Sequence, residues 1–230
     1  MKVNNQIRNP NEDEFEAVGS EVAAMTSLDL NEIEDLVRVE STPKADMQDL
    51  CMEMTHSVYP HKKIYGDFCP IQSYVKCPPL SAFKYLAETR ALSEWTYSLR
   101  DMVYLPEKNL YEFTDAIGGT TKCYTKTVAN SDAVTVDYHC AWDQPDHLWM
   151  IYLMRVVPAE LVLNKAGCVI TWINCRHPFY DENPFPELVP EGRKVWVGDG
   201  WPFFYAGHTV ELENLKRILE YRHAHDTWEF

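Results

Sequence analysis

The chain has 230 residues, enough for one large domain or one domain with an extension, and its 46% hydrophobic and 24% charged residues exclude wholesale disorder. With 21 Lys and Arg against 35 Asp and Glu, the formal net charge is -14, which disfavours nucleic acid and anionic membranes as partners. No apolar run approaches the ~20 residues of a membrane span, so we expect no membrane insertion.

The first part of the chain, 1–60, has apolar residues at helical spacing in three short segments. They predict a helix over 13–25, a second helix after Asp29 as N-cap, and a third that Thr42 and Pro43 open. Short helices with one apolar stripe each are not stable alone. We therefore expect an N-terminal helical extension, 1–60, that packs on a domain formed by 61–230.

From residue 67 onwards the pattern changes to strands. A strand over 68–77 leads through two prolines into a helix over 80–91, and a long helix over 202–225 ends the pattern. Six further strands are predicted between these helices, at 95–105, 110–117, 121–128, 133–142, 147–157 and 167–177. Their short separators are typical of antiparallel neighbours. A sheet with one apolar face must curl around a partner, here the last helix, and this arrangement predicts a ligand cavity between them.

This order of elements resembles a known superfamily. The motif VKCPPLSAFKYL (75–86), a strand that runs through Pro into a short helix, is similar to the helix-grip fold of the START/Bet v 1-like (SRPBCC) superfamily, including its polyketide cyclase/dehydratase-like members. LSEW (92–95) and the helix 204–221 extend the likeness over roughly 64–225. It implies an α+β protein with a curved antiparallel sheet of about seven strands around the C-terminal helix. Because the superfamily shares no catalytic motif, the likeness implies no catalytic residue.

The hairpin 121–142 separates apolar from charged positions. A two-residue turn at Asn130 and Ser131 would place Ala129 opposite Asp132. The side chains facing the cavity are then Cys123, Thr125, Thr127, Val134, Val136, Tyr138, Cys140 and Trp142. The outer face holds Lys122, Lys126, Thr135, Asp137 and His139. A turn one residue longer or shorter would exchange the two faces.

The next strand, 147–157, is apolar on both faces. If Trp142 pairs with His147, the inner face holds Trp149, Ile151, Leu153 and Arg155. The outer face then holds Leu148, Met150, Tyr152, Met154 and Val156. A strand apolar on both faces is covered on both. We therefore expect the N-terminal helices or a second subunit, and so a homodimer, on the outer surface.

Three residues are candidates for catalysis. His208 lies on the apolar stripe of the last helix and could act as a general base, or be a core histidine satisfied by a backbone carbonyl. Arg155 interrupts an apolar strand and could hold an anionic group or pair internally. Tyr138 is the third candidate. Glu211, three residues after His208, could orient the imidazole or face water.

The expected cavity wall is aromatic and aliphatic, and such a wall binds planar ligands by stacking or simply forms the core. The candidate ligand-binding residues are Cys123, Thr125, Trp142, Trp149, Trp172, Phe204, Leu212 and Leu215. A less favoured alternative is a metal site formed by Asp137, His139 and His177. The competing interpretation is that these residues belong to a solvated face.

The seven cysteines have no C-x-x-C pair, and nothing in the sequence predicts a cofactor. Without a secretory signal at the start, buried reduced thiols in a cytoplasmic protein are expected, although a nucleophilic Cys stays an alternative. The leading hypothesis is a protein that binds a small apolar or polyketide-like metabolite and catalyses its cyclisation or dehydration by proton transfer. Its rivals are a carrier or sensor without turnover and a metal-dependent enzyme.

Overall fold

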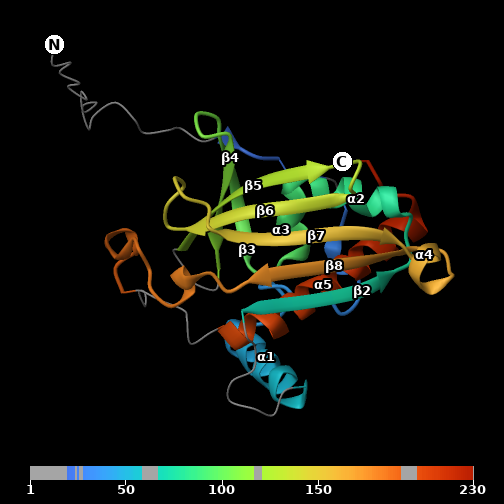
Figure 1. Cartoon of the computed structure of the whole chain (residues 1–230), viewed down its shortest axis with the longest axis horizontal. Coiled ribbons are helices and arrows are strands. Elements are labelled where there is room, and N and C mark those ends of the chain that lie inside the picture. The colour runs from blue at the N-terminus through green and yellow to red at the C-terminus, as the bar shows by residue number, and fades with distance from the viewer. Residues whose placement is uncertain are drawn as a thin grey trace.

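The computed structural model describes residues 20–23, 25, 28–58, 67–116, 121–192 and 201–229. Its strands (Figure 1) are β1 (Ser20–Glu21), β2 (Phe68–Val75), β3 (Leu99–Leu105), β4 (Leu110–Asp115), β5 (Thr121–Asn130), β6 (Thr135–Trp142), β7 (Met150–Pro158) and β8 (Cys168–Cys175). Its helices are η1 (Leu30–Glu32), α1 (Lys44–Val58), α2 (Pro79–Ala87), η2 (Thr89–Ala91), α3 (Leu92–Trp95), α4 (Ala159–Leu163), η3 (Pro178–Tyr180), η4 (Pro186–Leu188) and α5 (Trp201–His225).

One antiparallel sheet organises the chain, in the order β1-β3-β4-β5-β6-β7-β8-β2. It is curved and unclosed, and α5 lies across its inner face behind β8 and β2 in Figure 1. The expected helix-grip fold is confirmed, with eight strands because the two-residue β1 extends the edge at β3. Residues 13–19 of the helix predicted over 13–25 lie outside the described residues, and Ser20–Glu21 form β1 instead.

Local chemistry explains most of the element boundaries. Pro78 and Pro79 end β2 and start α2, because proline removes a ladder donor but suits the first helical turn. Asp29 caps η1 by accepting a hydrogen bond from the Asn31 N–H, as predicted. Gly167 has a φ of +110° before β8, where a Cβ atom would stand 2.5 Å from the Val75 carbonyl oxygen. Glycine is therefore required where β8 first meets β2.

The β5–β6 hairpin keeps the predicted faces with a different turn. Asn130 pairs with Thr135, so the loop spans 131–134 instead of two residues. The shift in register is even, and an even shift leaves each side chain on its face. Cys123, Thr125 and Tyr138 are accordingly buried on the inner face, while Lys126 is exposed on the outer one.

The prediction for the β6–β7 hairpin is wrong by one residue. Cys140 pairs with Met150 and Tyr138 with Tyr152, which places Trp142 level with position 148 instead of His147. The Gln144 side chain holds this loop by bonding both the N–H and the carbonyl of His147. A single extra loop residue exchanges the faces of β7. Its inner face therefore holds Met150, Tyr152, Met154 and Val156, and its outer face Ile151, Leu153 and Arg155.

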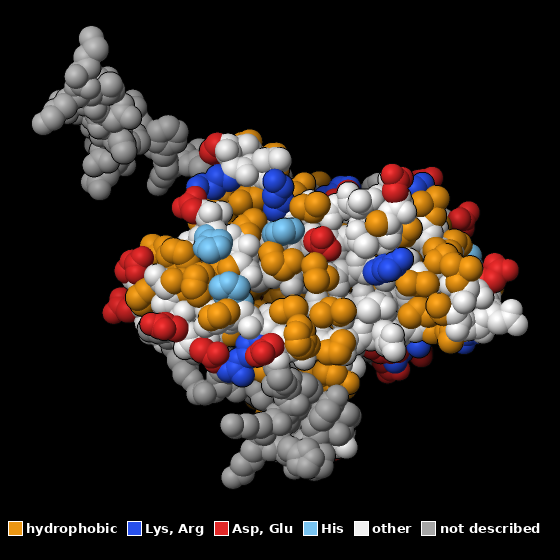
Figure 2. All heavy atoms as spheres, in the orientation of Figure 1, with side chains coloured by type: hydrophobic (Ala, Val, Ile, Leu, Met, Phe, Trp, Pro, Cys, Tyr) orange, Lys and Arg blue, Asp and Glu red, His pale blue; other side chains and the backbone are white. Residues whose placement is uncertain are grey.

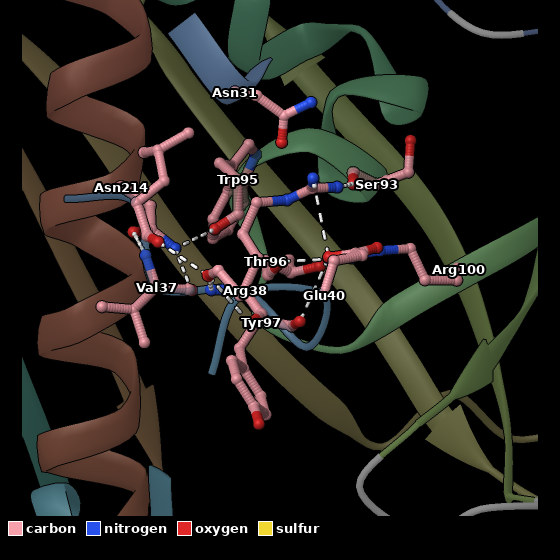
Figure 3. A network of polar contacts seen from close by, with 12 residues as sticks. Asn31, Val37, Arg38, Glu40, Ser93, Trp95, Thr96, Tyr97, Arg100 and Asn214 are labelled. Carbon is pink, nitrogen blue, oxygen red and sulfur yellow. Dashed lines mark hydrogen bonds and ion pairs between the residues drawn. The ribbon is translucent and has the colours of Figure 1, made fainter. Parts of the chain in front are cut away.

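The described part of the N-terminal region packs on α5 and not on the outer surface of β7, which corrects the second expectation for that strand. Met47 and Cys51 of α1 contact Ala206 and Val210 of α5. The segment 36–42, called the strap here, lies against α3, β3 and α5 through the polar contacts of Figure 3. The outer face of the sheet instead shows interspersed hydrophobic, charged and histidine side chains in Figure 2, with Leu153 still 41% exposed. The expected homodimer stays a prediction.

Candidate functional site

The inner face of the sheet carries one polar row directly beneath α5. Strand pairing aligns Tyr138, Tyr152 and Asn174 across β6, β7 and β8. Trp172 lies two residues before Asn174 and therefore on the same face. Trp172 and Asn174 are 2% and 1% exposed, so their polar atoms have left bulk water.

His208 of α5 packs against this row. Its ring stacks on Trp172 with 4.4 Å between ring centroids and meets Tyr152 and Phe204 edge-on at 5.4 Å each. Burial lowers the pKa of the imidazole to about 3, so His208 is neutral near physiological pH. Such an imidazole donates or accepts a hydrogen bond but is a weak base.

Two phenols adjoin Asn174: Tyr152 pairs with it across β7 and β8, and Tyr180 interacts with its side chain. Burial raises the pKa of both hydroxyl groups, so both phenols keep their protons. Contacts with Tyr152 and Asn174 act in the opposite direction on the pKa of Tyr180. The three side chains therefore form a neutral polar group between β7, β8 and η3.

Four side chains in this interior have buried polar atoms without a well-aligned hydrogen bond to the protein, although the Asn174 amide also acts on the Tyr180 hydroxyl. They are the Trp95 Nε1, the Trp172 Nε1, both amide atoms of Asn174 and the His208 Nδ1. We call Trp95, Trp172, Asn174 and His208 the inner polar cluster. They are contiguous, since Trp95 meets Trp172 edge-on at 5.5 Å and Trp172 stacks on His208. Because an unsatisfied buried polar group costs about 1–3 kcal/mol, the native fold usually avoids such a cluster.

Aromatic rings wall one side of the cluster. Trp142 meets Trp149 at 6.1 Å and Tyr180 at 6.2 Å, both edge-on. Tyr180 also meets Phe204 at 5.0 Å, which links the loop after β8 to α5. The structure thus brings the predicted residues Trp142, Trp149 and Phe204 into one aromatic wall that continues to His208.

The other predicted ligand-binding residues lie elsewhere on the inner face or in the core. Thr125 Oγ1 lies 3.4 Å from Cys140 Sγ and 3.8 Å from Cys123 Sγ, so these polar groups satisfy one another. Leu212 and Leu215 of α5 are 2% and 0% exposed in the hydrophobic core. They support the helix on the sheet.

Two of the three catalytic candidates are corrected by the structure. Arg155 is exposed on the outer face between Thr135 and Thr171, because the β6–β7 register turns it away from α5. Tyr138 is buried, but its hydroxyl donates to the Leu86 carbonyl oxygen at 2.6 Å and so ties β6 to α2. His208 and Tyr138 both keep their predicted places in the interior, and Arg155 does not.

The minority metal set is not assembled either. Asp137 and His139 lie on the outer face of β6, and His177 caps η3 by accepting a hydrogen bond from the Phe179 N–H at its Nδ1. Within the described ranges, no group of three or more His, Cys, Asp or Glu is placed to hold a metal ion. This alternative is wrong for these residues.

Glu211 does not orient His208. Its carboxylate accepts a hydrogen bond from the Tyr97 N–H at 2.8 Å, which links α5 to the segment before β3. Burial raises the pKa of this carboxyl to about 7. Glu211 therefore helps to hold α5 against the segment that leads into β3.

The cysteine thiols are mostly buried, and their pKa values shift in both directions, since a hydrogen bond with Cys77 lowers the pKa of Cys168. All seven are free thiols, and six are buried, with Cys175 exposed. Burial raises the pKa of Cys51 to about 11 and that of Cys69 to about 12, which disfavours the thiolate.

Sequence reasoning missed Asn174, Tyr180 and Trp95. Asn174 carried a usable signal, because it is a lone amide at an inner position of an otherwise apolar strand. Arg155 was singled out by the same logic, but its face was inverted. Tyr180 follows the last strand, and no periodicity places a loop residue against the core.

Comparison with known proteins places the chain in a family. A family model described as "Domain of unknown function (DUF8713)" matches residues 67–227. The chain belongs to the DUF8713 family. No curated protein matches this DUF8713 chain. Of the described helices, none combines the length and apolar character that crossing a membrane requires.

Several solved structures are similar to the DUF8713 chain at low identity. A START superfamily protein from Mycobacterium smegmatis is 14% identical, with 70% of this chain and 99% of that chain covered and a TM-score of 0.43. The di-domain ARO/CYC BexL from the BE-7585A biosynthetic pathway is 12% identical, with 68% and 47% covered and a TM-score of 0.47. DynU16, from the dynemicin biosynthetic locus, is 10% identical, with 68% and 48% covered and a TM-score of 0.42. The chain thus spans about half the length of BexL and DynU16. The DUF8713 chain has a helix-grip architecture, as its strand order and α5 show.

Proposed function

We propose that this DUF8713 chain binds a small, largely apolar metabolite between the sheet and α5. The inner polar cluster is the observation that carries the proposal, because four adjacent buried side chains have polar atoms without a well-aligned hydrogen bond to the protein. Ligand sites are commonly apolar and aromatic with a few convergent polar groups, and this interior has that composition. The polar cluster would orient the ligand, and the aromatic wall would supply contact area.

The experiment that tests this proposal is a screen of apolar metabolites by native mass spectrometry on the full chain. Asn174→Leu keeps the volume of the side chain and removes both amide atoms, so it is expected to weaken by about tenfold any ligand that hydrogen-bonds to this amide. The matched control is Thr171→Val, a change on the outer face of the same strand. If the two variants bind every hit equally well, the ligand lies elsewhere and the proposal fails.

A second candidate function is cyclisation or dehydration of the bound metabolite. The specific observation in its favour is His208, a neutral imidazole whose Nδ1 has no partner and which lies in the same interior. A neutral imidazole can donate a hydrogen bond to a developing enolate oxygen, as in known proton-transfer sites. A carrier or sensor uses the same interior without turnover.

Turnover separates the two candidates. A short linear triketone closes to a pyrone with loss of one water, and the pyrone is followed by its absorbance. An enzyme accelerates this step, and His208→Phe abolishes the acceleration while the triketone still binds. Binding without acceleration in the native protein supports the carrier.

A further inference from the structure

The unused atoms of the inner polar cluster are mostly hydrogen-bond donors. Trp95 and Trp172 each offer one indole N–H and no acceptor. The Asn174 amide adds two N–H donors and a single carbonyl acceptor, and the His208 Nδ1 takes either role according to tautomer. A molecule that satisfies this set must present oxygen acceptors to at least two of the donors.

Among the buried residues that the structure describes, no unpaired Lys or Arg accompanies these donors. Among the buried described residues, Arg222 is the one Lys or Arg side chain, and it bonds both carboxylate oxygens of Glu94 at 3.0 and 2.8 Å. Arg155, which was expected to hold an anion here, is exposed on the outer face. A carboxylate placed beside the cluster would lose its hydration without gaining a counter-ion, and this is costly in a protein interior.

The rings around the cluster favour a flat molecule. Trp172 and His208 lie nearly parallel at 28°, while Trp95 and Tyr152 present edges to Trp172 at 84° and 75°. These rings pack against one another, and an aromatic lining of this kind suits an aromatic or conjugated ligand that carries oxygen at its rim.

We propose that the inner polar cluster binds a neutral, planar molecule through carbonyl oxygens, such as an aromatic ketone or a quinone, and rejects a carboxylate of the same shape. The inference rests on the proposed function and deepens it by naming the ligand class. It assigns Trp95, Trp172 and Asn174 as donors to the ligand's oxygen atoms.

Three probes of one shape test the ligand class: naphthalene, acetylnaphthalene and naphthoate, the last two substituted at the same ring position. Their dissociation constants are measured at pH 7.5 by calorimetry on the full chain. Acetylnaphthalene is expected to bind at least about tenfold tighter than naphthoate, because only the anion loses a hydration shell that the cluster cannot replace. It should also bind about fivefold or more tighter than naphthalene, which has no acceptor.

A direct readout of the donors is the indole N–H resonance in a nitrogen-labelled sample. Acetylnaphthalene is expected to shift the Trp172 or Trp95 resonance downfield, and naphthalene is not. Trp172→Phe and Trp95→Phe assign these peaks. Asn174→Leu should reduce the advantage of acetylnaphthalene over naphthalene and leave naphthalene binding unchanged, with Thr171→Val as the control.

The outcomes distinguish this inference from the proposed function. If naphthalene and acetylnaphthalene bind equally, or naphthoate binds as tightly as the ketone, the ligand class is wrong while binding in the interior stands. If acetylnaphthalene binds without moving either indole resonance, the assigned donors are wrong. If none of the three probes binds, the proposed function itself fails. An aromatic interior that binds no aromatic ring would have no space for a ligand.

Discussion

The side-chain amide of Asn214 pairs with both backbone polar groups of Val37. Asn214 Oδ1 accepts from the Val37 N–H at 2.9 Å, and Nδ2 donates to the Val37 carbonyl at 2.7 Å and to the Trp95 carbonyl at 3.2 Å (Figure 3). The amide thus reproduces the pairing of a neighbouring strand, and it fastens the strap to α5. Asn214 is 1% exposed, so water cannot replace it.

Replacing Asn214 should release the strap. Asn214→Leu leaves the Val37 N–H and two carbonyl groups without partners, so we expect a loss of about 2 kcal/mol in the free energy of unfolding. Urea denaturation measures the loss, and faster proteolysis within 36–58 locates it. The exposed Asn31→Ala is the control and should change neither. Equal proteolysis of the two variants would show that other contacts hold the strap.

The buried ion pair of Glu94 and Arg222 predicts strong coupling between α3 and α5. Tyr85 also donates to Glu94 at 2.7 Å, and Arg222 donates to the Thr227 carbonyl at 2.7 Å. Arg222→Met leaves a buried carboxylate unpaired and should cost about 3–5 kcal/mol of stability. Adding Glu94→Leu should recover most of that loss, because two apolar side chains replace the pair. A double-mutant cycle in urea measures the coupling, and additive losses would contradict it.

His208 should make the fold sensitive to acid. Its pKa is about 3 in the folded protein against 6.5 for an unperturbed imidazole, so the unfolded chain binds the extra proton between those values. Stability present above pH 6.5 is therefore lost as the pH falls, by up to about 1.4 kcal/mol per pH unit. His208→Phe keeps a ring on Trp172 and should flatten this dependence in urea titrations from pH 7 to 4. The exposed His223→Gln should leave the dependence as steep as in the native protein.

Glu211 should make the stability of the fold depend on pH in the opposite direction. Its carboxyl pKa is raised from 4.5 to about 7, so the folded protein holds the proton longer than the unfolded chain. Stability is then greatest below pH 4.5 for this group and falls as the pH rises towards 7. Glu211→Gln keeps an oxygen acceptor for the Tyr97 N–H and should remove this fall. Glu213→Gln, on the exposed side of the helix, should change stability by less than about 0.5 kcal/mol.

Alanine substitutions at two glycines with positive φ distinguish the cost of backbone strain from the cost of a steric clash. Gly167→Ala forces a Cβ atom to 2.5 Å from the Val75 carbonyl oxygen at a φ of +110°, and should cost about 3 kcal/mol. Gly192→Ala has a φ of +80° with nothing within 4 Å, and should cost about 1 kcal/mol from backbone strain alone. Thermal unfolding compares them. Equal costs would mean that the β2–β8 junction yields to the added methyl group.

The sequence by itself determined the succession of elements, because their signals are local. The Pro78-Pro79 pair is incompatible with a continued strand and suits a helix start, and the apolar stripe from Phe204 to Leu219 indicates a buried helix. The inner face of β5 and β6 also followed from alternation, since an even error in the turn does no harm.

Only the tertiary structure decided which face of β7 looks inward and which polar atoms meet there. The loop between β6 and β7, which Gln144 holds, is one residue longer than expected. As a result Tyr152 faces inward and Arg155 faces outward. Trp172 and His208 come together from a strand and a helix far apart in the chain, and no local pattern relates them. The alternation of residues along a strand does not reveal the length of the loop before it. The strand register that determines which residues face the site therefore depends on tertiary contacts that cannot be read from the sequence.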